Sequence, residues 1–146
     1  MPRLDEAVEQ VLDAAVAAIE SSPDLTELAS VVRGERARPM PELPAVWVVP
    51  EPAVQAPETY GPQETWTLPL SLAALVRSDD PDEGARTAAR IAALARRAVL
   101  LASWPSWVLW ARSVRCDLAA RSSERNRVLH WADVTVEVRF SVEEVP

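Results

Sequence analysis

The sequence predicts an α+β domain of two layers, in which two helices pack on one face of a mainly antiparallel, four-stranded sheet. Residues 132–142 alternate between apolar and polar side chains, which is typical of a strand with one buried and one solvated face. In two Ala-rich segments, apolar residues recur every three or four positions, as in amphipathic helices. Strands come in pairs with a helix before each pair, and this order favours helices gathered on one side of the sheet.

The first helix is expected over Leu4–Ile19. Asp5 and Glu6 suit the positive N-terminal end of a helix, and the Ser21–Pro23 segment ends it. Residues 25–32 fit either a short helix or a turn leading into a short strand, and both alternatives stay open.

A proline-rich region follows, because eight of the 13 prolines lie between Pro39 and Pro69. Proline removes a backbone donor and fixes φ, so this region is not helical. A β-branched run bracketed by prolines predicts a buried strand at 44–50, and alternation predicts another at 65–72. Pro69 deletes one donor of the second strand, which favours a sheet edge or a bulge at that point.

The second helix is expected over Pro81–Ala102, because Asp80 suits the N-cap, proline suits the first helical position, and Glu83 lies three residues after Asp80. A third strand is expected over 109–118, and the long final strand starts near Val128. In the third strand, the expected shared face holds four side chains: Trp110, Val114, Cys116 and Leu118. We expect Cys116 to be a small buried apolar side chain.

Composition bounds the function. The 146 residues fit a single domain, 1–146, and the net charge of −7 argues against a protein that grips nucleic acid in a basic groove. All 15 basic residues are Arg; codon bias explains this most simply, while Arg also suits bidentate contacts at protein interfaces. No apolar run is long enough for a transmembrane helix and no signal pattern opens the chain, so we expect no membrane association and synthesis in a cytoplasm.

Groups that carry chemistry are sparse. His130 is the one histidine and Cys116 the one cysteine, so neither a metal site nor a nucleophilic triad is indicated. The acidic residues around Asp80 are better explained by helix capping than by calcium binding. We therefore expect a protein that is not an enzyme, with no catalytic residue, no cofactor and no metal.

Candidate interface residues are charged or aromatic. Arg36 and Arg38 lie in one charged loop, and Arg121 and Arg125 in another. Such loops are either solvated turns or sites of ion pairing between subunits. Trp107 lies in the middle of a cluster of three tryptophans, which is either a plug in the core or an exposed anchor for a partner.

In element order, size and loop character, the chain resembles the tail-terminator (tail-completion) proteins of long-tailed bacteriophages and phage-derived particles. The resemblance covers most of the chain and rests on five successive features. These are an N-terminal helix, the proline-punctuated strand Leu43–Val48, the strand Glu64–Leu70, the Ala/Arg-rich helix and the C-terminal strand Ala132–Val138.

The resemblance implies a structural virion protein that forms a hexameric ring, caps the tail tube, ends its polymerisation and joins the tail to the head connector. The implied partners are further copies of the chain, the tail tube protein and the head–tail connector protein, with DNA passing through the lumen without specific binding. The implied location is the tail of a virion or phage-like particle assembled in the host cytoplasm. Three other functions stay open: a head–tail connector or stopper protein of the same particle, a small monomeric protein-binding module, and an enzyme of α+β fold.

Overall fold

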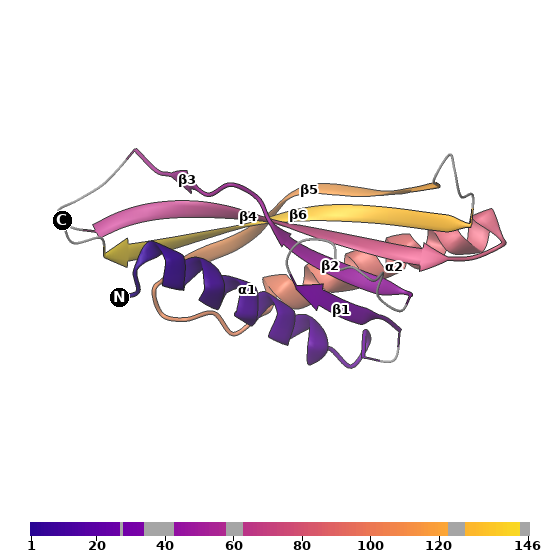
Figure 1. Cartoon of the computed structure of the whole chain (residues 1–146), viewed down its shortest axis with the longest axis horizontal. Helices are drawn as coiled ribbons and strands as arrows, with labels where there is room; N and C mark the ends of the chain where they lie inside the picture. The colour runs from indigo at the N-terminus through magenta and orange to yellow at the C-terminus, as the bar shows by residue number, and fades with distance from the viewer. Residues whose placement is uncertain (27, 34–42, 58–62, 123–127, 144–146) are drawn as a thin grey trace.

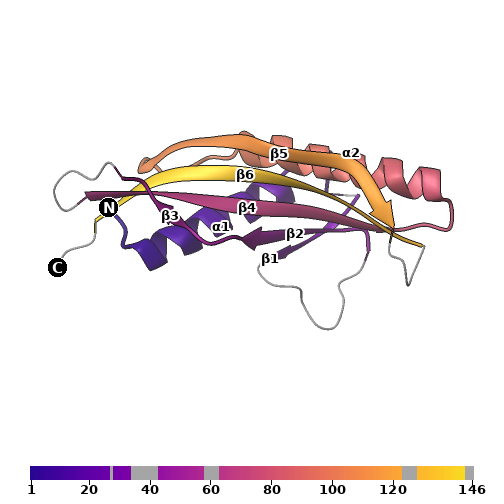
Figure 2. The same ribbon diagram turned by 90° about the horizontal axis from the view of Figure 1, so that it is seen from above.

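The computed structural model describes residues 1–26, 28–33, 43–57, 63–122 and 128–143. The elements follow one another as α1 (Leu4–Glu20), β1 (Ser30–Arg33), β2 (Ala45–Pro50), β3 (Val54–Gln55), β4 (Gln63–Arg77), α2 (Pro81–Leu100), β5 (Val108–Ser122) and β6 (Leu129–Glu143). The strands form one sheet in the order β1-β2-β4-β6-β5, and β3 pairs with β4 beyond the end of β2. Both helices cover the same face of this sheet (Figures 1 and 2).

The predicted α+β class and the two helices are confirmed, but the four-stranded antiparallel sheet is wrong in detail. Over the described residues the sheet has six strands and is mixed, because β1 pairs with β2 in parallel. Residues 30–33 are too few to show a period, so the sequence left this segment open between helix and strand. The two-residue β3, in the proline-rich region, is likewise too short to show a period, so the sequence did not predict it.

Pro69, where we expected a sheet edge or a bulge, lies at a gap between β2 and β3 on one side of β4, whereas on the other side β4 pairs with β6 without interruption through Pro69↔Glu137. β2 pairs with β4 as far as Pro50↔Leu70, and β3 takes over at Val54↔Thr67. The Pro69 carbonyl accepts a hydrogen bond from the Glu51 N–H at 2.9 Å. In an antiparallel pair the N–H and C=O groups of one residue point to the same side of the strand. The side of Pro69 that lacks an N–H group therefore faces the gap between β2 and β3.

The second helix starts as predicted. The carboxylate of Asp80 accepts hydrogen bonds from the N–H groups of Asp82, at 3.0 Å, and Glu83, at 3.3 Å. Pro81 occupies the first turn, where no intrahelical donor is required. The helix ends at Leu100, two residues before the expected end at Ala102.

The final strand lies inside the sheet, between β4 and β5. β6 pairs with β4 from Gln63↔Glu143 to Arg77↔Leu129 and with β5 on its other side. The expected apolar face is confirmed, because four inward side chains are fully buried: Val134, Val136, Val138 and Phe140. On the opposite face, Glu137 and Arg139 are half-buried where we expected exposure, because side chains from β5 lie beside them.

The predicted face of the third strand is wrong. β5 has register shifts between Val108 and Trp110, between Ser113 and Arg115, and between Asp117 and Arg121. Each extra residue interrupts the period-two alternation. As a result Trp110 pairs with Arg139 on the face away from the helices, while Cys116 pairs with Val134 on the helix side. Cys116 is exposed and not buried, because it lies on the outermost strand.

The Phe140 side chain should be a main determinant of stability. It is fully buried, and the Trp107 ring meets it edge-on at a centroid distance of 5.8 Å and an angle of 83°. Phe140→Ala should lower the free energy of unfolding by about 3–5 kcal/mol in a urea titration. Ser141→Ala, one position along on the uncovered face, is the control and should change it by less than about 0.5 kcal/mol. A loss below about 1 kcal/mol for Phe140→Ala would contradict full packing of this face.

Gly84 is required by the imidazole of His130. A Cβ atom at Gly84 would overlap the Cδ2 atom of this buried ring. Alanine is the better helix former by about 1 kcal/mol, yet Gly84→Ala should destabilise the protein, because overpacking costs about 1–3 kcal/mol. In a His130→Ala background the same substitution should become stabilising. Additive effects of the two substitutions in thermal and urea unfolding would contradict this contact.

Candidate assembly surface

The longest open edge of the sheet is β5. Among the described strands this 15-residue strand pairs with β6 alone, so its outer backbone groups have no neighbouring strand. The opposite side of the sheet is formed by the four-residue β1 and the two-residue β3. Unpaired edges are templates for association with another chain, so the β5 edge is the first candidate for a contact surface.

Three exposed aliphatic side chains lie along β5, each beside or within a register shift. They are Leu109, 55% exposed, Val114, 47% exposed, and Leu118, 37% exposed. A bulged residue has no direct partner across the ladder, so its neighbours cannot cover its side chain. These three are half of the six large apolar side chains exposed among the described residues, and the edge is therefore apolar as well as open.

A charged and aromatic cluster borders this edge on the face away from the helices. The guanidinium carbon of Arg112 lies 4.5 Å from the centroid of the Trp110 ring, and that of Arg139 lies 5.6 Å from it. Arg112 also pairs with the Glu137 carboxylate at 3.3 Å. The Arg112 side chain is still 64% exposed, so it is held in place while remaining accessible to a partner.

The sequence-predicted interface residues are only partly placed. Arg36, Arg38 and Arg125 lie outside the described residues. The backbone of Arg121 pairs with Trp131 near the end of β5, and its side chain is outside the described part. Trp107 is half-buried against Phe140, which fits a core plug, and its role at an interface stays a prediction.

Sequence analysis did not identify Leu109, Val114 and Leu118 as exposed, because regular alternation placed Val114 and Leu118 on one shared face with Trp110 and Cys116. The sequence does show that this segment is apolar. Apolar side chains indicate an exposed surface only when the strand lacks a second partner strand, and the structure is needed to show that β5 is such an edge.

In the described part of the chain, His130 lies in the core and no acidic, histidine or cysteine cluster suits a metal ion. His130 is 2% exposed, and its Nε2 atom lies 3.2 Å from the Ser78 carbonyl oxygen, inside the core beneath Gly84. No group of three or more His, Cys, Asp or Glu side chains in this part of the chain could hold a metal ion. Neither of the two described helices has the length and apolarity needed to cross a membrane.

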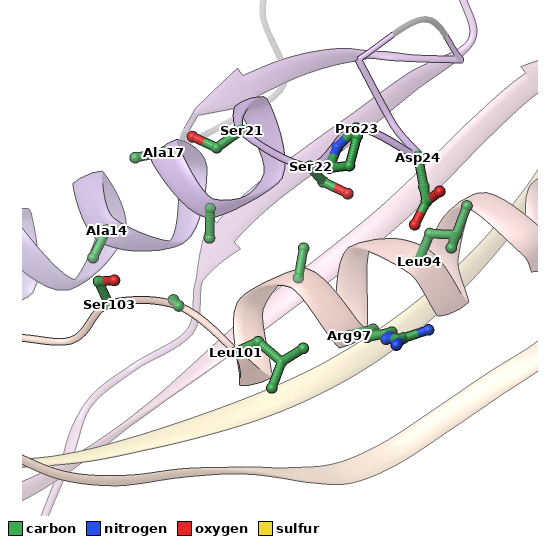
Figure 3. A pocket seen from close by; sticks show the side chains of 13 residues that line it. Ala14, Ala17, Ser21, Ser22, Pro23, Asp24, Leu94, Arg97, Leu101 and Ser103 are labelled. Carbon is green, nitrogen blue, oxygen red and sulfur yellow. The ribbon is translucent and has the colours of Figure 1, made fainter.

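A cavity of about 480 Å³ lies between the C-terminal halves of the two helices (Figure 3). Its described lining is mostly small: alanines of α1 and α2, the Ser21–Asp24 turn and Ser103. Asp24 and Arg97 are the charged members, and no histidine or cysteine accompanies the serines of this lining. Among the described lining residues, the Asp24 carboxylate is therefore the group that could act as a base.

At the level of sequence, the chain matches neither a protein-family model nor a curated protein. Its fold does have a counterpart among solved structures. A chain of the structure titled "Virion of native gene transfer agent (GTA) particle" superposes with a TM-score of 0.50 and 15% sequence identity, covering 96% of this chain and 96% of that chain. At this identity the likeness is one of fold, and it extends over essentially the whole of both chains.

The cluster around Trp110 should contribute measurable coupling. Trp110→Leu and Arg112→Gln should couple by about 0.5–1 kcal/mol in a double-mutant cycle of urea unfolding, because each removes the same stacked contact. The matched control replaces Arg112→Gln with Arg90→Gln, an exposed arginine of α2, and should show additive effects. A coupling energy no larger than that of the control pair would contradict an Arg112 side chain that is fixed by stacking on the Trp110 ring.

Proposed function

We propose that this protein is a structural subunit of a phage-like particle and forms a ring that caps the tail tube. The ring, hexameric as in the tail terminators that the sequence resembles, ends tail polymerisation and joins the tail to the head connector. The observation that carries the proposal is the fold shared over 96% of both chains with a protein of a gene transfer agent virion.

The geometry supports assembly as the activity. A ring of identical subunits needs two different, complementary surfaces on each copy. This sheet has two open sides of different character: the long apolar β5 edge, and the side formed by β1 and β3. Each subunit could therefore contact one neighbour on each side.

The proposed mechanism involves no turnover of a substrate, no cofactor and no metal. His130 supports this, because its packing against Gly84 and its contact with the Ser78 carbonyl give it a structural role in the described core. The partners are further copies of the chain, the tail tube protein and the head–tail connector protein.

The charge distribution supports passage of DNA without binding. The net charge is −7, and α1 carries five acidic side chains and no basic one: Asp5, Glu6, Glu9, Asp13 and Glu20. An acidic wall removes the gain from counterion release that drives DNA binding. Assembly would take place in the host cytoplasm, and the subunit would remain in the tail of the particle.

The proposal predicts the shape of particles made without this protein. Electron microscopy of a producing strain that lacks the gene should show tails of irregular length and heads without tails. A plasmid copy of the gene should restore uniform, joined tails. Uniform but detached tails would instead assign the neighbouring role of a connector or stopper, and normal joined particles would refute a role at this junction.

The same complementation tests the four arginines that the sequence predicts at an interface, of which Arg121 lies in β5 and not in a loop as expected. Arg36→Glu, Arg38→Glu, Arg121→Glu and Arg125→Glu should leave folding intact and reduce the number of joined particles, because a like-charge clash recurs at every interface of a ring. Arg90→Glu on α2 is the matched control and should complement fully. Full complementation by all four interface variants would refute their assignment to an interface.

A further inference from the structure

Two open edges of the sheet carry apolar side chains at the same level. Val54 of β3 pairs with Thr67 of β4, Thr67 pairs with Arg139 of β6, and Arg139 pairs with Trp110 of β5. Val54 is 62% exposed at one end of this row. At the other end lies Leu109, 55% exposed, in the register shift directly before Trp110.

The row two positions along the strands carries opposite charges at its two ends. The Glu51 N–H donates to the Pro69 carbonyl at 2.9 Å, Pro69 pairs with Glu137, and Glu137 pairs with Arg112. Glu51 is exposed on the side between β2 and β3, and the Arg112 side chain is 64% exposed on the β5 side. An acidic and a basic group thus lie at one level on opposite sides of the domain.

We propose that copies of this chain contact one another head to tail. The β5 edge of one copy lies against the opposite side of the next copy's sheet, at the place next to β3 where Glu51 and Val54 are exposed. In this contact Leu109 packs beside the neighbour's Val54, and Arg112 pairs with the neighbour's Glu51. The inference rests on the proposed ring and names the surfaces that close it.

The equal levels are what a closed ring requires. Neighbours in a ring are related by a rotation with no rise along the axis, so for an axis along the strands the contacting groups must lie at the same height. Surfaces offset along the strands would generate an open helical filament instead. Both matched pairs on this sheet satisfy the condition.

Pairing of two β5 edges about a two-fold axis is less favourable than the head-to-tail contact. If two β5 edges paired about a two-fold axis, the exposed Arg112 and Arg115 of each copy would be brought toward those of the other. Like charges opposed on neighbouring strands are destabilising. The register shifts also interrupt the β5 ladder, so we infer a contact made by side chains and not a sheet continued from copy to copy.

Cysteine cross-linking tests the proposal directly. In a Cys116→Ser background, Val54→Cys and Leu109→Cys are introduced together, and particles or purified rings are treated with a short bis-maleimide. The double variant should give a ladder of covalent oligomers. An equal mixture of the two single variants should stop at dimers, because each copy then carries one reactive side chain.

Matched controls and outcomes separate this inference from the proposed function. Val54→Cys with Leu101→Cys, a leucine 73% exposed at the end of α2, should give no ladder. Dimers from Leu109→Cys alone would overturn the head-to-tail contact in favour of two-fold pairing, and no ladder from the 54/109 pair in particles that contain the protein would also overturn it. A ladder together with normal joined tails in the deletion strain would keep the contact and refute the proposed function.

A charge exchange provides an independent arm of the same test. Arg112→Glu and Glu51→Arg should each reduce the ladder and the number of joined particles at least tenfold. The double exchange should restore both, although the contact of Arg112 with its own Glu137 remains lost. Loss without restoration would show that Arg112 acts only within its own subunit and would overturn the proposed ion pair.

Discussion

The pairing of β4 with β6 along their whole length is the constraint on which the rest of the structure depends. It joins fifteen successive residue pairs and places the fully buried face of β6 at the centre of the helix-covered side. Each fully buried Val, Leu or Phe side chain contributes about 1.5–3 kcal/mol relative to exposure. Both helices pack on this face: α2 lies over β4, β5 and β6, while α1 packs against α2 as well as β1, β2 and β6.

The position of β6 between β4 and β5 also decides where the sheet is open. With β4 and β5 on its two sides, the chain leaves β5 as one edge and distributes the other between β1 and β3. Bulges commonly protect an edge strand from uncontrolled pairing. In β5 they also leave Leu109, Val114 and Leu118 uncovered, so the same irregularity that blocks a continuous ladder provides apolar side chains for a specific contact.

The use of arginine is consistent with such an edge. Arg112 stacks on Trp110 and pairs with Glu137 at the same time. A planar guanidinium can make both contacts, whereas the compact ammonium of lysine is a less suitable stacking group. Whatever the origin of the all-arginine composition, the structure shows one place where arginine has a physical advantage.

The sequence by itself determined the local features: the alternation that buries Val134 and Phe140, the Asp80 cap with Pro81, and the two amphipathic helices. These depend on side-chain period and on hydrogen bonds between residues a few positions apart.

Only the tertiary structure decided four other features: the number of strands, the parallel pairing of β1 with β2, the opposite faces of Trp110 and Cys116, and the half-burial of Glu137. Among the interface residues, the sequence identified charged loops and Trp107, but Leu109, Val114 and Leu118 became candidates only when β5 proved to be a bulged edge. The physical reason is that strand order and register are set by contacts between distant segments, and a period read along one segment carries no information about the strand beside it.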